Sequence, residues 1–367
     1  MADQRTVRRT AGIVAGLLIA LVFLLVIVPG ALAIGLKLLG IIDASYARSA
    51  LRLTVPIAFA GMGGIFAEKS GVINIGLEGL LIISAFSAIA VMWFIGGGGA
   101  GARMVALFGG VLASLVVTLL FAIICIEFKA DQIVAGLAVW LIALGFAPFG
   151  SIVIWETVNS DSVGSFDPLA VPLLSEVPYV GEVLFTATPP VYLMLAAVPF
   201  SWYLLNRTAF GKHLQASGED PKTLDTAGVS VRKVRYMGVL LSGLYCGIGG
   251  AGLALNAGQF VGGGETITSG RGWIGLTTYL IANYNPVGAF LASFGFAGLD
   301  ALQLQIQRVP GVELSSTLIE IIPYAAVLVV LAFVGKPGCR SPPGNTTSPR
   351  TERSGSVRME RSLPAGR

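Results

Sequence analysis

The stretch from Met104 to Ile126 reads MVALFGGVLASLVVTLLFAIICI and contains no charged residue. About twenty apolar residues are enough for a helix to cross the hydrocarbon core of a bilayer. A second such stretch runs from Ala11 to Ile34. Of the 367 residues, 54% are hydrophobic and only 12% are charged, whereas a soluble domain has about 25% charged residues. The sequence therefore predicts an all-α polytopic membrane protein.

Ten transmembrane helices are predicted, separated by mostly short connections. They cover approximately residues 11–34, 50–67, 71–95, 104–126, 132–155, 188–205, 236–258, 271–284, 286–307 and 314–334. The transmembrane domain would span residues 11–335, preceded by a short N-terminal segment, residues 1–10. Residues 336–367 are rich in Ser, Pro and Arg, so we expect a disordered tail.

Two longer loops differ in charge and so predict the orientation of the chain. Loop 156–187 contains acidic residues but no Lys or Arg. Loop 206–235 contains basic residues, namely Arg207, Lys212, Lys222, Arg232, Lys233 and Arg235. Because cytoplasmic loops carry the excess of Lys and Arg, loop 156–187 is expected outside and loop 206–235 in the cytoplasm. With ten spans, both termini are cytoplasmic.

An internal repeat relates residues 70–83 to residues 269–282. Without gaps, seven of the fourteen positions are identical, among them two glycines. In the predicted topology the two copies enter the membrane from opposite sides. Spans 1–5 and 6–10 would then form two inverted five-helix repeats, as in many transporters. Chance similarity between two glycine-rich apolar segments is the alternative.

Polar residues within the apolar spans are candidates for a solute path, because polar groups in lipid are costly. Asn74 and Glu78 are four residues apart and would share one face of a helix, with Glu78 about 10 Å from its start. The Glu78 carboxylate would either pair with a buried partner or border a wet cavity. The repeat aligns Trp273 with Asn74 and Thr277 with Glu78.

Further residues near the span ends extend this candidate path. Trp273 could stack on an aromatic or sugar ring, or could anchor the helix at the membrane interface. Asn256, Gln259 and Asn283 could form hydrogen bonds with a polar solute. Arg271 is expected to be solvated at the external mouth, and Asp300 has no identifiable partner in the sequence.

The cytoplasmic loop contains a short, well-delimited helix signal. Asp220 can cap the N-terminus, Pro221 suits the first helical position, and Gly228 suits a left-handed C-terminal stop. A capped helix in the largest cytoplasmic loop is typical of a surface that meets a soluble partner.

The sequence contains no P-loop, no GxSxG and no HExxH motif, and its cysteines lack metal-ligand spacing. We therefore expect no enzyme activity, no cofactor and no metal in this chain. If transport is driven by ATP, separate subunits must hydrolyse it.

Four segments in order resemble the membrane permeases of bacterial ABC importers for nucleosides and simple sugars, the branched-type permease family. They are GIFAEKSGVINIGLEG at 64–79, ADQIVAG at 130–136, the loop 211–235, and GRGWIGL at 270–276. The resemblance covers approximately residues 50–335, and Val72–Glu78 is similar to the nucleoside branch. Gln132 departs from relatives, which often have an acidic residue there, and the tail after Gly335 differs from the usual family ending.

The resemblance implies a permease subunit that moves a small polar solute, a nucleoside above all, across the bacterial cytoplasmic membrane. It also implies two ABC ATPase subunits, a second identical or homologous permease, and an extracytoplasmic solute-binding lipoprotein. The residues that would couple the permease to the ATPase are Gly218, Glu219, Asp220, Pro221, Lys222, Asp225 and Gly228. The alternatives are a pentose or other simple-sugar permease and an ion-coupled secondary transporter. No nucleic-acid partner is expected.

Overall fold

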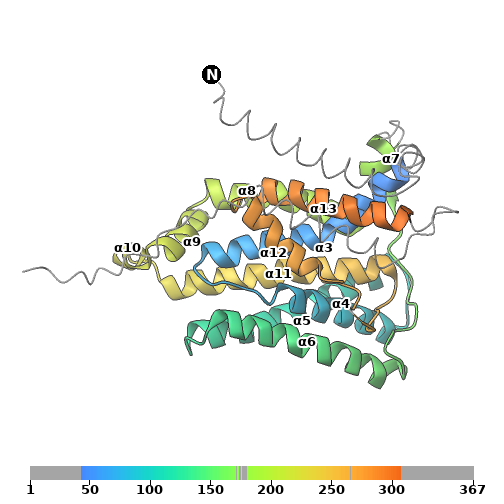
Figure 1. Cartoon of the computed structure of the whole chain (residues 1–367), viewed down its shortest axis with the longest axis horizontal. Helices are drawn as coiled ribbons and strands as arrows, with labels where there is room; N and C mark the ends of the chain where they lie inside the picture. Colours follow the sequence, from blue (N-terminus) through green and yellow to red (C-terminus); the bar gives the residue numbers. More distant parts are fainter. Residues whose placement is uncertain (1–42, 171, 173–174, 176–179, 265, 307–367) are drawn as a thin grey trace, which may run out of the picture. The chain divides into compact units, whose positions relative to one another are not determined.

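The computed structural model describes residues 43–170, 172, 175, 180–264 and 266–306 (Figure 1). The predicted spans 11–34 and 314–334, the N-terminal segment and the tail lie outside these residues. The described part is mostly helical, as predicted, with one pair of two-residue strands.

The helices overlap the predicted spans between residues 50 and 307, with two additional helices in loop 206–235 and one in loop 156–187. They are α3 (Ala44–Lys69), α4 (Leu77–Phe94), α5 (Ala100–Ile126), α6 (Gln132–Trp155), α7 (Val180–Leu184), α8 (Pro189–Arg207), α9 (Ala209–Glu219), α10 (Pro221–Thr226), α11 (Val231–Ala257), α12 (Arg271–Ile281) and α13 (Pro286–Ile306). The strands β1 (Leu169–Ala170) and β2 (Thr186–Ala187) pair antiparallel, with Leu169 opposite Ala187.

Among the described residues, six helices are long and apolar enough to cross a membrane: α3, α4, α5, α6, α11 and residues Pro286–Gln305 of α13. The α8 helix covers predicted span 188–205 but is not among these six. The α12 helix has 11 residues and a length of about 16 Å, roughly half of the hydrocarbon core. Residues 271–284 therefore contain a half-length helix rather than a complete span.

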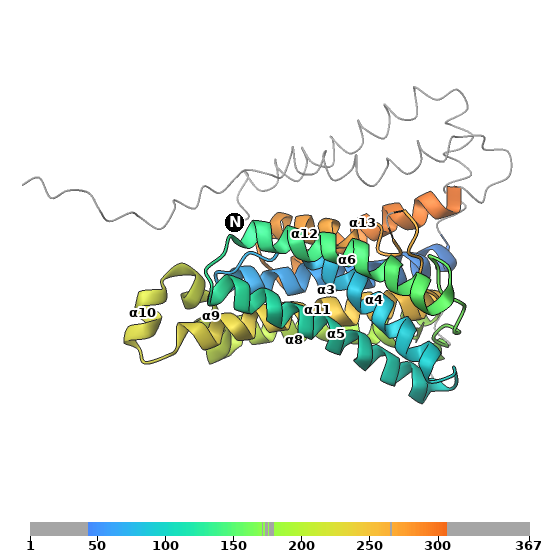
Figure 2. The same cartoon turned by 90° about the horizontal axis from the view of Figure 1, so that it is seen from below.

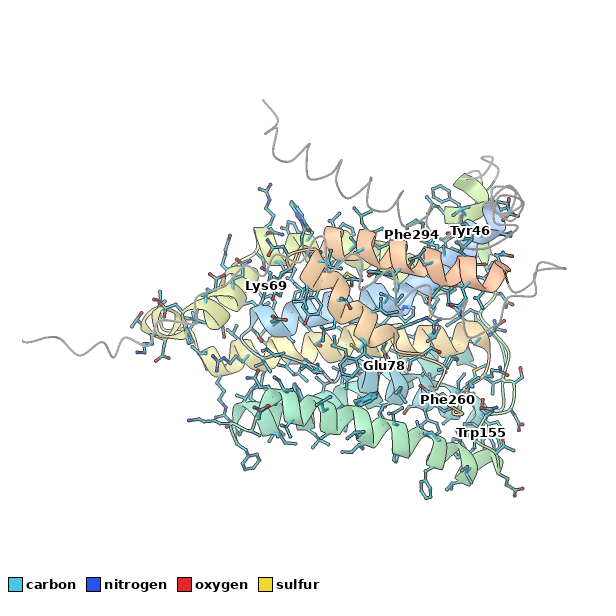
Figure 3. All side chains as sticks on the ribbon, in the orientation of Figure 1. Tyr46, Lys69, Glu78, Trp155, Phe260 and Phe294 are labelled. Carbon is cyan, nitrogen blue, oxygen red and sulfur yellow. The ribbon has the colours of Figure 1, made fainter. Side chains whose placement is uncertain are left out.

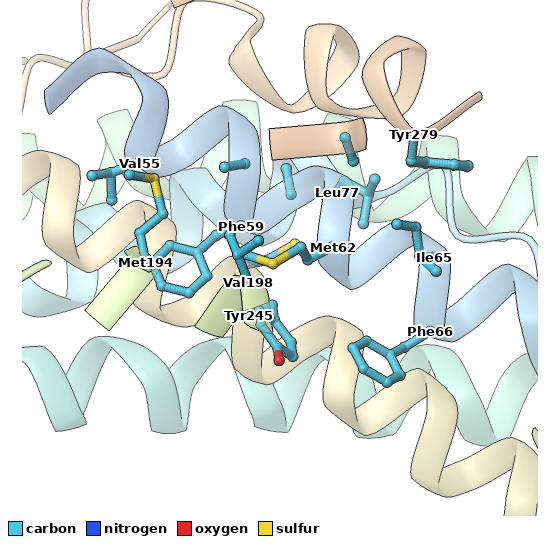
Figure 4. Close-up of a cluster of buried hydrophobic side chains, with 14 of the residues drawn as sticks. Val55, Phe59, Met62, Ile65, Phe66, Leu77, Met194, Val198, Tyr245 and Tyr279 are labelled. Carbon is cyan, nitrogen blue, oxygen red and sulfur yellow. The ribbon is translucent and has the colours of Figure 1, made fainter. Parts of the chain in front are cut away.

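The centre of the described bundle is the contact between α3 and α11, which lie side by side in Figures 1 and 2. A Cβ on Gly63 would lie 2.9 Å from the carbonyl oxygen of Ser242, so the two backbones touch there. Next to this contact Phe66 stacks on Tyr245 with ring centroids 5.4 Å apart (Figure 4). The Tyr245 hydroxyl lies 2.6 Å from the Ser201 hydroxyl of α8. The buried tyrosine thus keeps a polar partner.

The two copies of the sequence repeat agree at one turn and then differ. Gly71 and Gly270, which the repeat aligns, both have a positive φ, 90° and 73°. After Gly270 the helix α12 begins at once, whereas α4 begins only at Leu77. The copies therefore share a left-handed glycine but not the start of the following helix.

Candidate functional site

The chain between α3 and α4 is a non-helical segment inside the bundle. Helix α3 ends in a Schellman motif, in which Gly71 N–H donates to Glu68 O at 3.0 Å and Val72 N–H donates to Ala67 O at 3.2 Å. Gly71 has a φ of 90°, a conformation that glycine adopts without the Cβ penalty. The prediction of a helix from residue 71 is therefore wrong, because this motif reverses the chain and delays α4 until Leu77.

Side-chain amide oxygens accept hydrogen bonds from backbone N–H groups of this segment, which have no helical partner. The Ile73 N–H donates to Gln132 Oε1 at 2.7 Å, and the Gly76 N–H donates to Asn74 Oδ1 at 3.0 Å. Asn74 is 3% exposed, and its Nδ2 donates to Ser242 Oγ of α11 at 3.1 Å. Buried backbone groups outside helices need such partners. Asn74 therefore stabilises the non-helical segment between α3 and α4 and does not project from a helix face.

Glu78, near the start of α4, accepts hydrogen bonds from residues 268–272 at the start of α12 and so connects the first half of the chain to the second. Its side chain is 2% exposed, and Oε1 accepts from Thr268 Oγ1 at 2.5 Å and from Gly270 N–H at 3.0 Å. Oε2 accepts from Gly272 N–H at 2.5 Å. These amides belong to the N-terminus of α12, where a carboxylate is stabilised by unpaired N–H groups and the helix dipole.

The geometry of Glu78 decides between the two predicted roles. The expectation that Asn74 and Glu78 share a helix face is wrong, because Asn74 precedes α4 and Glu78 is its second residue. The alternative of a buried partner is the one observed, and that partner is mainly backbone. Figure 3 shows Glu78 midway between Lys69 and the pair Trp155 and Phe260. The N-termini of α4 and α12 thus meet inside the bundle.

Trp273 lies in the same region, on the third position of α12. Its ring and the ring of Trp140 from α6 are nearly perpendicular, with centroids 5.5 Å apart. Both tryptophans are partly exposed. Thr277, one turn further along α12, donates its hydroxyl to Trp273 O at 2.8 Å. Asn74, Glu78, Trp273 and Thr277 are therefore brought into one neighbourhood.

The other predicted path residues do not join this group through any described contact. Gln259 and Asn283 are exposed, and Asn283 lies in the turn after α12 with a φ of 50°. Asn256 lies near the end of α11 and is partly exposed. Its buried Oδ1 has no hydrogen-bond partner within the described part of the chain.

Arg271 and Asp300 form a partly buried ion pair that the sequence did not predict. Arg271 Nη2 lies 3.3 Å from Asp300 Oδ2, and the two side chains are 14% and 15% exposed. Arg271 Nη1 also donates to the carbonyls of Ile267 and Thr268 at 3.2 Å. The expectation of a solvated Arg271 and an unpartnered Asp300 is therefore wrong. Both residues fix the start of α12 against α13.

Glu68 is a second residue that binds α12, at its other end. Its carboxylate accepts from Tyr279 Oη at 2.8 Å and from Tyr284 Oη at 2.6 Å. The tyrosines lie in and just after the last turn of α12. A carboxylate next to a span end suggests only an interfacial charge, so the sequence carried no signal for this contact. Both ends of α12 are tied to the stretch between Glu68 and Glu78.

Loop 206–235 forms two helices, of which α9 packs against the same stretch and α10 packs on α9. As predicted, Asp220 caps α10, accepting from Thr223 N–H at 3.3 Å, and Gly228 ends it with a φ of 77°. Before α10, Ser217 Oγ of α9 donates to Ser70 O at 3.0 Å. A Cβ on Gly218 would lie 2.5 Å from Lys69 O. The loop therefore touches the break between α3 and α4 directly.

Loop 156–187 packs its first part along the end of α11. Backbone hydrogen bonds run from Ser160 N–H to Phe260 O, from Val163 N–H to Gly258 O and from Phe166 N–H to Leu255 O, at 2.8–3.1 Å. This paired segment leads directly into residues 263–270 and so to the start of α12.

An apolar groove of about 430 Å³ is lined by Leu115, Leu204, Phe210, Met237, Leu240, Leu241 and Leu244. Its lining offers a polar solute no side-chain hydrogen-bond partner. The neighbourhood of Glu78 and Trp273 is therefore the better candidate site. Within the described residues, no group of three or more His, Cys, Asp or Glu side chains could hold a metal ion.

Comparison with known proteins gives a family and several relatives. The family described as "Branched-chain amino acid transport system / permease component" matches residues 46–332. The nucleoside ABC transporter permease protein NupC of Lactococcus lactis subsp. cremoris (strain MG1363) is 34% identical over 293 residues, 77% of this chain and 90% of NupC. The guanosine ABC transporter permease protein NupQ of Bacillus subtilis (strain 168) is 36% identical over 248 residues, 66% of this chain and 77% of NupQ.

A sugar permease is also among the relatives. The galactofuranose transporter permease protein YtfT of Escherichia coli (strain K12) is 28% identical over 203 residues, which cover 54% of this chain and 53% of YtfT. The putative glucose ABC transporter permease protein TsgC13 of Haloferax volcanii is 34% identical over 269 residues, 72% of this chain and 79% of TsgC13. Relatives named for nucleosides and for a sugar are thus similar to this chain to about the same degree.

Proposed function

The chain belongs to the family of permease components of branched-chain amino acid type transport systems, and we propose that it is the permease subunit of an ATP-driven ABC importer for nucleosides. Two relatives named for nucleosides or guanosine, at 34% and 36% identity, support this solute class. On this proposal the chain is not an enzyme and binds no cofactor. Partner subunits hydrolyse the ATP.

The observation that carries the proposal is the contact between the cytoplasmic loop and the break after α3. Ser217 and Gly218 lie directly against Ser70 and Lys69. A soluble motor that moves α9 would therefore act on the non-helical segment without an intervening element. A transporter driven only by an ion gradient has no need of such a contact.

The coupling surface would consist of α10 and the end of α9. Leu224 is buried and anchors α10. Most of the residues around it are exposed, as expected for a docking surface: Gly218, Glu219, Asp220, Lys222, Asp225 and Gly228, with Pro221 partly exposed. These are the residues that we assign to contact with the ATPase.

The solute path would follow the N-termini of α4 and the half-length helix α12. The coupling movement would pass from Ser70 through Asn74 and Glu78 to the start of α12. Trp273 and Thr277 on α12 would then change their exposure to the two sides. ATP binding shifts this equilibrium only as far as it binds one orientation more tightly than the other.

The assembly and location follow from the same proposal. The chain would pair with a second permease, identical or homologous, and receive solute from an extracytoplasmic binding lipoprotein. It would lie in the bacterial cytoplasmic membrane with both termini and loop 206–235 inside and loop 156–187 outside. Spans 1–5 and 6–10 within residues 11–335 would be inverted repeats.

Simple sugars are the alternative solutes, and the similarity to the galactofuranose permease supports them. A pentose would use the same hydrogen-bonding groups as the ribose of a nucleoside. An ion-coupled transporter is the remaining alternative, and its support is limited to the buried carboxylates of Glu78 and Asp300.

The decisive experiment is reconstitution of the complex purified from its own host. Proteoliposomes with the ATPase and the binding protein should take up labelled guanosine only with internal ATP. The triple variant Glu219→Ala/Asp220→Ala/Asp225→Ala should lose uptake but retain the protein level of the wild type. A control variant, Asp161→Ala in the opposite loop, should retain uptake.

Uptake by this chain alone under an ion gradient would overturn the importer proposal. Uptake of ribose but of no nucleoside, with ATP, would replace the solute and keep the mechanism.

A further inference from the structure

Trp140 and Trp273 form an aromatic pair far from either end of α6. Trp140 is the ninth residue of this 24-residue helix, about 12 Å from its start and about 22 Å from its end at 1.5 Å per residue. Trp273 lies one residue beyond Gly272, whose N–H binds Glu78. Tryptophan in membrane proteins is enriched at the two interfaces, where its N–H meets water. A pair of tryptophans at this depth needs another reason.

The backbones around the pair approach each other closely. A Cβ on Gly79 of α4 would lie 2.8 Å from Trp140 Cα, and one on Gly272 would lie 2.6 Å from Glu78 Cα. Both helices that carry the tryptophans are therefore held against the first turn of α4. These backbone contacts fix the positions from which the two rings project.

The rings are held but not enclosed. Their perpendicular arrangement, at 86° and 5.5 Å between centroids, leaves each indole with a face that the other does not cover. Both residues remain partly exposed. Thr277 lies one turn from Trp273 and keeps its hydroxyl lone pairs available, because it acts as a donor to Trp273 O.

We propose that Trp140 and Trp273 form the subsite that holds the heterocyclic base of the solute during its passage. This inference rests on the proposed nucleoside transport and specifies which residues recognise the base. Every nucleobase has a flat π face that stacks on an indole, so the subsite would accept purines and pyrimidines alike. A free pentose has no such face and would gain much less.

Binding of guanosine to the purified permease–ATPase complex, without the binding protein, tests this directly. Equilibrium dialysis with labelled guanosine avoids the binding protein, which would otherwise set the apparent affinity. Trp140→Ala and Trp273→Ala should each weaken binding at least about fivefold, from the usual contribution of one stacked base. Trp273→Phe, which keeps a π face, should stay within about threefold of the wild type.

Two controls separate stacking from misfolding. Trp202→Ala removes a tryptophan that is 37% exposed on α8 and should leave guanosine binding unchanged. Recovery of the ATPase with each variant reports assembly, and it should equal that of the wild type.

Equal guanosine binding by the wild type and both alanine variants would overturn the subsite. Ribose binding reduced as much as guanosine binding would also overturn it, because the pair would then recognise the sugar. The proposed function is judged separately, by guanosine uptake in the wild-type complex.

Discussion

Glu78 stabilises the contact between the halves of the chain through backbone amides and a hydroxyl instead of through an ion pair. Hydrogen bonds to an ionised carboxylate are shorter and stronger than neutral ones, and here all three donors come from residues 268–272. The nearby Arg271 is engaged by Asp300. The start of α12 therefore has two separate fixed points, one on α4 and one on α13.

Gly272 makes the first of these fixed points possible, and a methyl group there should break it. In Gly272→Ala the new Cβ would lie 2.6 Å from Glu78 N and Cα, and backbone cannot move aside as a flexible side chain does. Overpacking of this kind costs about 1–3 kcal/mol. We expect a lower thermal unfolding temperature of the detergent-purified protein, together with reduced uptake.

Gly145→Ala on α6 is the matched control, because nothing lies within 4 Å of a Cβ at that position. Alanine in a helix is favoured over glycine by about 0.5–1 kcal/mol, so the unfolding temperature should stay equal or rise slightly. Equal unfolding temperatures for the two variants would contradict the close approach of α12 to α4.

At the scale of elements, the sequence predicted most helices but not the interruption at residues 70–76. Val72, Ile73 and Ile75 are as apolar as the following helix, so hydropathy predicted one continuous span over residues 71–95. The break depends on Gly71 and on the Gln132 side chain, which is 59 positions from its partner. Such distant partners cannot be read from periodicity.

Local signals were predicted well because they depend on neighbouring residues. The cap of α10 by Asp220 and its end at Gly228 require only contacts within four positions. The partners of Glu78, Glu68 and Arg271 do not. Thr268 is 190 positions from Glu78, and the repeat, which aligns Thr277 with Glu78, carries no information on this contact.

The cap of α10 gives a prediction for the dependence of this helix on pH. Hydrogen bonds from the Thr223 hydroxyl and then from its N–H hold the pKa of Asp220 below its ordinary value. Folding therefore favours the ionised form, so the cap contributes fully above the ordinary pKa and is lost as the pH falls through the lower folded-state value. Hydrogen exchange of the amides of residues 222–227 should lose protection as the pH falls below about 4, the ordinary pKa of an aspartate.

Asp220→Asn is the reference for this measurement, because its amide oxygen accepts the same bond and does not titrate. It also corrects for the intrinsic pH dependence of exchange. An identical loss of protection in the wild type and in Asp220→Asn would show that the carboxylate does not control α10.

For the whole molecule, burial separates an inner set of helices from an outer one. Most residues of α3, α4 and α11 are buried, whereas α5 and α6 expose large apolar side chains such as Phe108, at 68%, and Phe146, at 52%. Apolar side chains exposed on helices of this length suit contact with lipid or with another apolar helix. The outer helices thus mark the surface that the bilayer or a second permease would cover.

The topology of the molecule can be tested with single cysteines in a Cys339→Ser background. Cys125 and Cys246 are buried, so they should react slowly with maleimides. Asp161 and Thr226 are both exposed but lie in loops of opposite charge. By the positive-inside rule, an impermeant maleimide should label Asp161→Cys in intact cells and Thr226→Cys only after permeabilisation.

Each of these two cysteine variants is the control for the other, because both are labelled with the same reagent. Labelling of both variants in intact cells would place the two loops on one side and would contradict an odd number of crossings between them.

The meeting of the N-termini of α4 and α12 inside the bundle has a consequence for the passage of ions. Each helix N-terminus carries roughly half a positive charge, which an ionised Glu78 carboxylate beside them would offset. Arg271 and Asp300 cancel one another. The charges at the meeting of the two N-termini thus largely offset one another. A cation would therefore find no net negative charge there to bind. An uncharged solute could then pass without an accompanying flow of sodium ions or protons that would discharge the membrane potential.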